Sequence, residues 1–130
     1  MTAFFDTNVL VYAASSDARK GRADLTLREG GVISVQVVNE FTSVARRKMR
    51  MDWPHVEEAV ARMQDMFDLI LPLTLETHAA AVALARDHSL AFYDALILAA
   101  AIEAGCETLY SEDFQHGWRF GDCTIVNPFL

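Results

Sequence analysis

Four acidic side chains in this sequence stand where a strand is expected to end or a helix to begin, and each has apolar neighbours. They are Asp6, Glu40, Asp94 and Asp113. A carboxylate in such surroundings is costly unless it is paired, hydrogen-bonded or bound to a metal. If the four converge, divalent cations would balance their mutual repulsion. Carboxylate oxygens are hard ligands, so they favour Mg²⁺ or Mn²⁺ over zinc.

Asp6 and Glu40 have the most unusual neighbours. The apolar residues 3–5 run directly into Asp6, and the first 18 residues contain no lysine or arginine that could neutralise it. Glu40 lies between Val37 and Val44 at helical spacing, on a stripe that is expected to face inward. A surface glutamate is not expected there. For Asp6, metal coordination is considered beside an ordinary structural role.

Each acid taken alone also has an ordinary structural explanation. Asp94 could cap a helix, Asp113 could belong to a turn, and Asp6 could accept hydrogen bonds at the end of a strand. These alternatives stay open for the single residues. Four acids at comparable positions favour one shared cation site.

A site of this kind hydrolyses phosphodiesters without a histidine base. One or two cations polarise the phosphate, activate water near neutral pH and stabilise the leaving oxygen. The four histidines do not have the spacing of a metal-binding motif; they are His55, His78, His88 and His116. The sequence also lacks a nucleophile-elbow motif and a glycine-rich phosphate loop, which excludes the corresponding enzyme classes.

Length and composition predict a single domain spanning residues 1–130. With 52% hydrophobic residues, the chain is long enough for one packed core and too short for two ordinary domains. The longest apolar run, residues 95–102, is far shorter than the roughly 20 residues of a membrane span. The N-terminus also lacks the features of a secretion signal. We therefore expect a soluble cytoplasmic protein with no membrane partner.

The remaining composition is less specific. Cys106 and Cys123 lack metal-binding or disulfide spacing and are expected to be buried thiols. The net charge of −7 argues against indiscriminate nucleic-acid binding, but a carboxylate site contributes to that charge, so a nuclease is not excluded. Two basic groups, Arg19-Lys20-Arg22 and Arg46-Arg47-Lys48-Arg50, are either solvated helix faces or contacts for RNA backbone or an acidic partner.

The segments that must position the acids alternate between strands and helices. Short apolar runs predict strands at residues 3–5, 32–35, 69–73, 108–110 and 124–126. Helical periodicity predicts helices at residues 36–48, 54–67, 74–88 and 92–104. In the third helix Ala79, Val82 and Ala83 are expected to face inward, and the fourth helix is expected to be buried. The pattern predicts an α/β fold whose parallel sheet carries the acids at the carboxyl ends of its strands.

Four segments carry the acids in a specific form: Phe5-Asp6-Thr7-Asn8-Val9-Leu10-Val11-Tyr12, Val38-Asn39-Glu40-Phe41, Phe92-Tyr93-Asp94-Ala95-Leu96-Ile97 and Ser111-Glu112-Asp113-Phe114-Gln115-His116-Gly117. In this order they resemble the motifs of PIN-domain ribonucleases, specifically VapC-type toxins of bacterial toxin–antitoxin pairs. The resemblance covers nearly the whole chain and ends with Ile125-Val126-Asn127-Pro128-Phe129. One departure is Tyr93, which stands where relatives often carry tryptophan.

The resemblance implies a three-layer α/β/α sandwich around a five-stranded parallel sheet, and a Mg²⁺- or Mn²⁺-dependent endoribonuclease. Asp6 and Asp94 would be the main metal ligands, and Glu40 and Asp113 would complete the acidic pocket directly or through water.

Three polar residues match positions that support the acids in the family. They are Thr7, Asn8 and Ser111, and their side chains would hold the carboxylates in place, as metal sites require. Ordinary turn chemistry is the alternative for them.

The resemblance also implies partners. VapC-like toxins form homodimers and are silenced by a cognate antitoxin, whose tail crosses a groove and blocks the acidic pocket, often with a basic side chain. Flexible thioethers and an aromatic residue suggest a lining for this groove, namely Met49, Met51, Trp53, Met63 and Met66. Core packing is the alternative for Met63.

Alternatives from other classes remain. A phosphoacceptor signalling domain also gathers carboxylates at strand ends, but it resembles a pattern with paired acids near the first strand and a lysine after the fifth. A dehalogenase-like phosphatase would need a second aspartate at position 8, which is Asn8. A catalytically silent PIN-like binding module is the third alternative, and the four intact acids disfavour it.

Overall fold

The computed structural model describes residues 2–130 as one α/β unit. The elements in chain order are β1 (Ala3–Phe5), α1 (Thr7–Ala13), α2 (Lys20–Leu27), β2 (Val32–Ser34), α3 (Val35–Arg47), α4 (Trp53–Met66), β3 (Leu69–Leu71), α5 (Leu75–His88), α6 (Phe92–Glu103), β4 (Thr108–Tyr110), β5 (Arg119–Phe120) and β6 (Cys123–Val126). In the part of the chain described here, no helix combines the length and apolarity needed to cross a membrane.

The strands form one sheet in the order β3-β2-β1-β4-β6-β5. The five predicted strands pair in parallel, which confirms the predicted α/β architecture. The sheet also has a sixth strand that was not predicted, because the short β5 adds an antiparallel partner to β6. That strand has only two residues and no apolar run of its own, so periodicity does not mark it.

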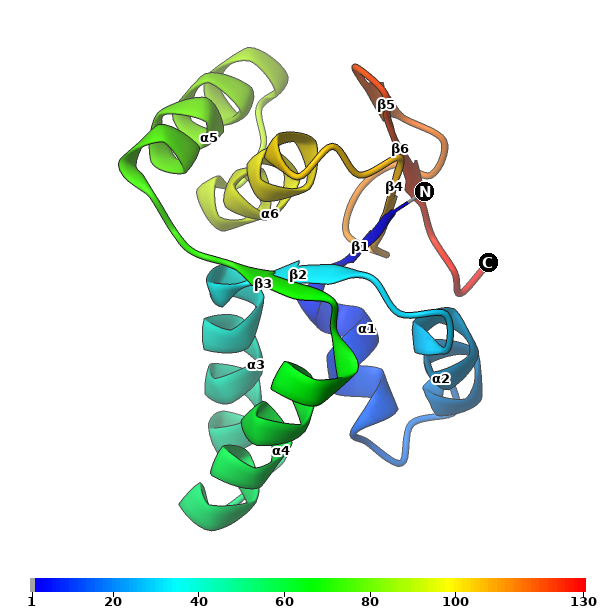
Figure 1. The fold of residues 1–130 in the computed structure, drawn as a ribbon. Helices are drawn as coiled ribbons and strands as arrows, with labels where there is room; N and C mark the ends of the chain where they lie inside the picture. The colour runs from blue at the N-terminus through cyan, green and yellow to red at the C-terminus, as the bar shows by residue number, and fades with distance from the viewer. Residues whose placement is uncertain (1) are drawn as a thin grey trace.

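The order of the strands determines which face each helix covers. From β1 the chain moves outward through β2 to β3, and then returns to pair β4 with the other side of β1. Right-handed crossovers in opposite directions place their helices on opposite faces. Accordingly, α1 to α4 lie on one side of the sheet and α5 and α6 on the other (Figure 1). The sheet therefore has a topological switch point between β1 and β4, outside which ligands bind in such folds.

The core is formed by the central strands and the helices on both sides of them. Phe4, Phe5, Ile33, Leu109 and Ile125 are fully buried strand residues. Burial on both faces explains why these strands are continuous apolar runs rather than alternating ones. The predicted burial of the helix at α6 is confirmed, because every residue from 95 to 101 is buried.

Gly31 allows β1 and β2 to approach closely. Its φ of +152° is one that other residues rarely adopt, and a Cβ there would stand 2.5 Å from the Ala3 carbonyl oxygen and 2.6 Å from the Phe5 ring. The glycine just before β2 is therefore a steric requirement of the sheet.

Two helices were not predicted. α1 is a seven-residue apolar segment with β-branched residues, which periodicity does not distinguish from a strand. α2 begins after Arg19 without a side-chain cap and is only weakly amphipathic. The predicted strand over residues 32–35 ends one residue earlier, because Ser34 caps α3 by accepting a hydrogen bond from the Val37 amide.

The inward face predicted for α5 was wrong. Val82 is 44% exposed, whereas Thr77 and Ala81 are fully buried against α6. Thr77 Oγ1 donates a 2.7 Å hydrogen bond to Glu103 Oε2 on α6. The helix is rich in alanine and pairs with α6 through small residues, so its buried face carries no strong apolar stripe.

Candidate active site

The four acids come from four separate segments that meet at the carboxyl ends of the central strands. Asp6 directly follows β1 and Asp113 follows β4, whereas Glu40 lies in α3 and Asp94 in the first turn of α6. Glu40, Asp94 and Asp113 line one cavity of about 820 Å³. Asp6 is buried, with 1% of its surface exposed. The structure therefore brings the acids together at the switch point of the sheet.

Asp6 is held by short hydrogen bonds. Its Oδ1 accepts from the Thr7 amide at 2.6 Å, and its Oδ2 accepts from the Ser111 hydroxyl at 2.6 Å. Burial raises the pKa of Asp6 to about 7; the Ser111 and Thr7 hydrogen bonds oppose this rise, and the charges of Asp113 and Glu40 add to it. A cation beside Asp6 would restore its charged form at neutral pH.

Asp94 is less buried and lacks a partner. Burial raises the pKa of Asp94 to about 6, and the charges of Asp113 and Glu40 add to the rise. Within residues 2–130 no hydrogen bond or ion pair reaches its carboxylate. Ala91 is the N-cap of α6, so the capping explanation for Asp94 does not hold. Asp6, in contrast, does cap α1.

Glu40 is oriented from two sides. Its Oε1 accepts from Thr7 Oγ1 at 2.9 Å, and its Oε2 accepts from Gln36 Nε2 at 3.0 Å. Gln36 was missed in the sequence, although it stands one helical turn before Glu40 and pairs at this spacing are common. The result is a glutamate with a fixed carboxylate plane on the wall of the cavity.

Asn8 and Ser111 link Asp6 to Asp113. Asn8 Nδ2 donates to Asp113 Oδ2 at 3.1 Å and lies 3.5 Å from both Asp6 Oδ2 and Ser111 Oγ. The Asp113 amide donates to Ser111 Oγ at 3.0 Å. All three predicted supporting residues, Thr7 included, therefore contact an acid. The buried Asn8 Oδ1 has no hydrogen-bond partner in the described chain.

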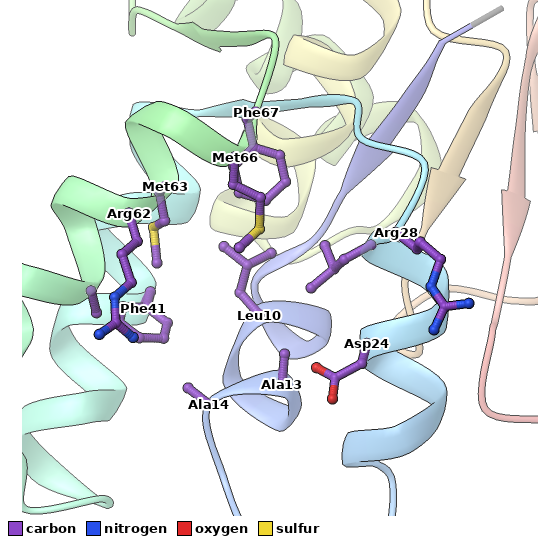
Figure 2. A pocket seen from close by; sticks show the side chains of 12 residues that line it. Leu10, Ala13, Ala14, Asp24, Arg28, Phe41, Arg62, Met63, Met66 and Phe67 are labelled. Carbon is purple, nitrogen blue, oxygen red and sulfur yellow. The ribbon is translucent and has the colours of Figure 1, made fainter.

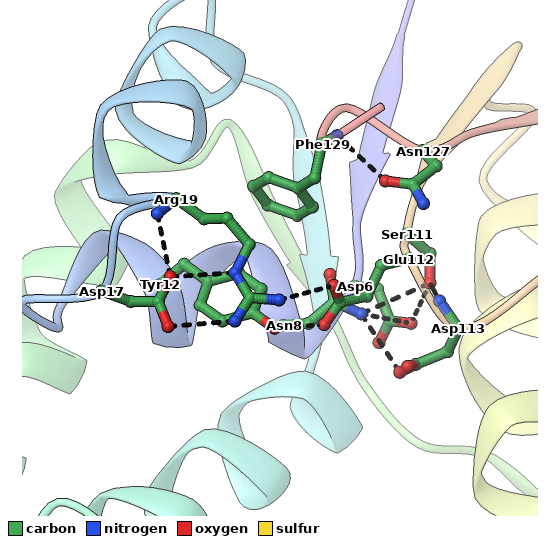
Figure 3. A network of polar contacts seen from close by, with 10 residues as sticks. All are labelled: Asp6, Asn8, Tyr12, Asp17, Arg19, Ser111, Glu112, Asp113, Asn127 and Phe129. Carbon is green, nitrogen blue, oxygen red and sulfur yellow. Dashed lines mark hydrogen bonds and ion pairs between the residues drawn. The ribbon is translucent and has the colours of Figure 1, made fainter.

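A second polar network surrounds this centre and was not anticipated (Figure 3). Tyr12 donates its hydroxyl to Glu112, and the Arg19 guanidinium lies 4.1 Å above the Tyr12 ring. Arg19 also pairs with Asp17 at 2.9 Å and with Glu112 at 3.5 Å. Burial and Glu112 raise the pKa of Tyr12 to about 12. The network connects α1 to the segment after β4. Glu112 and Arg19 therefore have structural partners within the network.

The donor set of the cavity suits a hard divalent cation. Such a cation would neutralise the carboxylates that meet here and would favour the charged form of the buried Asp6. Across residues 2–130, no group of three or more His, Cys, Asp or Glu side chains is arranged so that it could hold a metal ion together. This spacing is compatible with Mg²⁺, which keeps several water ligands and takes only one or two carboxylates.

A second cavity of about 400 Å³ lies between α1, α2, α3 and α4 and is mostly apolar. Met63 and Met66 of α4 line it, and Met66 points toward Leu10 of α1 (Figure 2). Arg62 and Asp24 also belong to the lining. Met63 and Met66 are the two predicted groove residues that line this cavity. Met49 and Met51 pack against the core, and the Trp53 ring lies under the Arg46 guanidinium.

Comparison with known proteins identifies the class to which this fold and site belong. The PIN domain family model matches residues 3–116, so the chain belongs to the PIN domain family. No curated protein matches the chain.

Solved structures with a similar fold include three toxin–antitoxin proteins. A toxin–antitoxin complex from Klebsiella pneumoniae is 24% identical, with a TM-score of 0.75 over 98% of both chains. VapC20 of Mycobacterium tuberculosis, a sarcin-ricin loop cleaving toxin, is 21% identical, with a TM-score of 0.74 over 86% of this chain and 90% of its own. VapBC2 from Rickettsia felis, bound to a promoter DNA fragment, is 18% identical, with a TM-score of 0.68 over 96% and 97%.

Proposed function

We propose that this protein is a metal-dependent endoribonuclease that acts in the cytoplasm as the toxin of a toxin–antitoxin pair. The observation that carries the proposal is a cavity lined by Glu40, Asp94 and Asp113 at the switch point of a PIN-domain sheet. The buried Asp6 is joined to Asp113 through Asn8. Of the alternatives raised from the sequence, family membership leaves only a catalytically silent PIN-like module.

The proposed chemistry is hydrolysis of an RNA phosphodiester bond. Bound Mg²⁺ or Mn²⁺ would supply charge stabilisation of the phosphate and a water activated at neutral pH. Asp6 and Asp94 would be the main ligands, because both are acids whose charged forms are disfavoured by burial in the absence of a cation. Glu40 and Asp113 would complete the site directly or through water.

The supporting residues would fix the ligand oxygens before substrate arrives. Ser111 and the Thr7 amide hold both oxygens of Asp6, and the Thr7 hydroxyl holds Glu40. Asn8 donates to Asp113. Such preorganisation limits the rearrangement needed when charge develops on the phosphate.

The proposed partners are a second copy of this chain and a cognate antitoxin. All three solved relatives named above carry toxin or toxin–antitoxin descriptions, and one aligns over 98% of both chains. A basic side chain of an antitoxin tail would be attracted to the acidic cavity. The apolar cavity lined by Met63 and Met66 would take an apolar part of the same partner. We expect Met66→Asp to weaken antitoxin binding, and Trp53→Ala to leave it unchanged.

Cleavage of purified total RNA tests the proposed activity. We expect discrete fragments with Mg²⁺ or Mn²⁺, and no fragments with EDTA or with the Asp6→Asn variant. Asp65→Asn, an exposed acid of α4, is the matched control and should cleave like the wild type. Calorimetric metal binding by the wild type without cleavage of any RNA would support the silent-module alternative instead.

A further inference from the structure

The acidic cavity has a second, basic wall on α3. Glu40, Val44, Arg47 and Lys48 all line the cavity, and residues 36, 40, 43, 44 and 47 fall on one helix face at spacings of three or four. At 1.5 Å per residue, the wall from residue 36 to residue 48 is roughly 18 Å long. A nucleotide strand in a duplex rises about 3.4 Å per nucleotide. The wall is therefore long enough to lie along several nucleotides.

The two basic residues on this wall have no acidic partner. Among residues 2–130 neither Arg47 nor Lys48 forms an ion pair, and Arg47 contacts only Ser43 Oγ, at 3.1 Å. Arg46, one position earlier, is occupied by the Met51 carbonyl and the Trp53 ring. Arg47 and Lys48 thus present free positive charge beside an acidic centre, in a chain whose net charge is −7.

Tyr93 is the more exposed of the two tyrosines that line this cavity. It lines the cavity directly before Asp94 and is 63% exposed. Tyr12 lines the same cavity, but its ring is covered by Arg19 at 4.1 Å and by the edge of Phe129 at 5.0 Å. The Tyr12 ring is therefore held between two partners. Within residues 2–130 the Tyr93 ring has one ring contact, a tilted one with the neighbouring Phe92 at 5.8 Å between centroids, and most of its surface stays exposed.

We propose that Tyr93, Arg47 and Lys48 form a platform for single-stranded RNA. Tyr93 stacks on an unpaired base next to the phosphate that is cut, and Arg47 and Lys48 bind backbone phosphates farther along α3. An exposed aromatic ring beside a basic groove is the usual arrangement for single strands, because an unpaired base offers a free face for stacking. Paired bases in a duplex have no free face, so the platform selects loops and single-stranded segments. This inference rests on the proposed ribonuclease function.

Binding of a labelled random-sequence RNA pool tests the platform. The protein carries Asp6→Asn so that no cleavage occurs, and the pool is compared with an RNA duplex. We expect Tyr93→Ala to weaken single-strand binding about 10- to 100-fold and Tyr93→Phe to retain it. Arg86→Gln, an exposed arginine of α5 that pairs with Asp87, is the control without effect.

The salt dependence separates stacking from phosphate contacts. Each phosphate contact on a single strand contributes about 0.7 to the slope of log K against log salt. The Arg47→Gln/Lys48→Gln variant should therefore lower this slope by about 1.4, whereas Tyr93→Ala should leave it unchanged. A structural role for these exposed residues would produce neither pattern and would lower the melting temperature instead.

Three results would overturn the platform. The first is equal binding by wild type and Tyr93→Ala while the wild-type enzyme cleaves RNA. The second is equal affinity for single strands and duplex. The third is loss of antitoxin binding in these variants with RNA binding intact, which would make the wall a protein interface. Failure of the ribonuclease function looks different, since the chain with all four acids intact would then cleave no RNA with Mg²⁺ or Mn²⁺, whether or not it binds single strands.

Discussion

The two polar networks beside the cavity use similar side chains in opposite ways. The inner network around Asp6 is buried, and its carboxyl is partly protonated near neutral pH despite two hydrogen bonds of 2.6 Å. The outer network around Arg19 is partly exposed and pairs each acid with a cation or a phenol. Exposed acids that are paired with cations stabilise a fold slightly. Buried acids without a cation reduce stability, and such groups cluster at functional sites.

Replacing Asp94 tests the inner network with the largest expected effect. Asp94→Asn removes a carboxylate that has no hydrogen-bond or ion-pair partner among residues 2–130. We expect RNA cleavage to fall at least about 1,000-fold, corresponding to roughly 4 kcal/mol of lost transition-state stabilisation. The fold should persist, with equal or higher melting temperature in metal-free buffer, because one negative charge is removed. Cleavage assays and thermal melts measure the two effects. Full activity in a folded variant would refute the role of Asp94.

Ser111→Ala tests how much the buried hydroxyl contributes. Its loss leaves Asp6 Oδ2 with only the 3.5 Å contact from Asn8 and removes the acceptor for the Asp113 amide. We expect a 10- to 100-fold loss of activity or metal affinity and about 1–3 kcal/mol lower stability. Thr26→Ala, which removes an α2 hydroxyl that donates to the Arg22 carbonyl and does not line the cavity, provides the comparison. Equal effects of the two substitutions would show that the Asp6 contact is unimportant.

The metal-free protein should lose stability as pH rises. Asp6 has a pKa of about 7 in the fold and an ordinary value of 3.8, so between these values the folded state holds a proton that the unfolded state releases. Stability therefore falls from about pH 4 to pH 7, by up to about 1.4 kcal/mol per pH unit for this group, and then levels off. Denaturant melts of wild type and Asp6→Asn measure the slope. An identical slope in both proteins would contradict the assignment to Asp6.

The outer network should give the smallest effect. Arg19→Gln removes an exposed ion pair and the contact with the Tyr12 ring. We expect the melting temperature to fall by no more than about 5 °C, and by less at high salt. Metal binding should not change, because Arg19 contacts none of the four acids. A loss of metal affinity would mean that the two networks are coupled.

The sequence predicted the parts of this site that follow from parallel sheet topology. Asp6 and Asp113 follow apolar strands, and strand ends meet at one edge, so their proximity was predictable. The contacts of three residues were missed. The Gln36 contact with Glu40 depends on the side-chain rotamers. Glu112 contacts Tyr12 and Arg19, which lie about 100 positions away in the sequence. The two helices after β1 were missed for a local reason, since one is short and apolar and the other lacks a capping side chain.

The central claim is that the acids form a divalent-cation site, and titration calorimetry tests it most directly. Mn²⁺ is titrated into metal-free wild type, Asp94→Asn and the control Asp65→Asn at neutral pH. The account predicts saturable binding by the wild type and the control, a higher melting temperature of both with metal, and loss of both effects in Asp94→Asn. No binding by a folded wild type, or equal binding by Asp94→Asn, would contradict it.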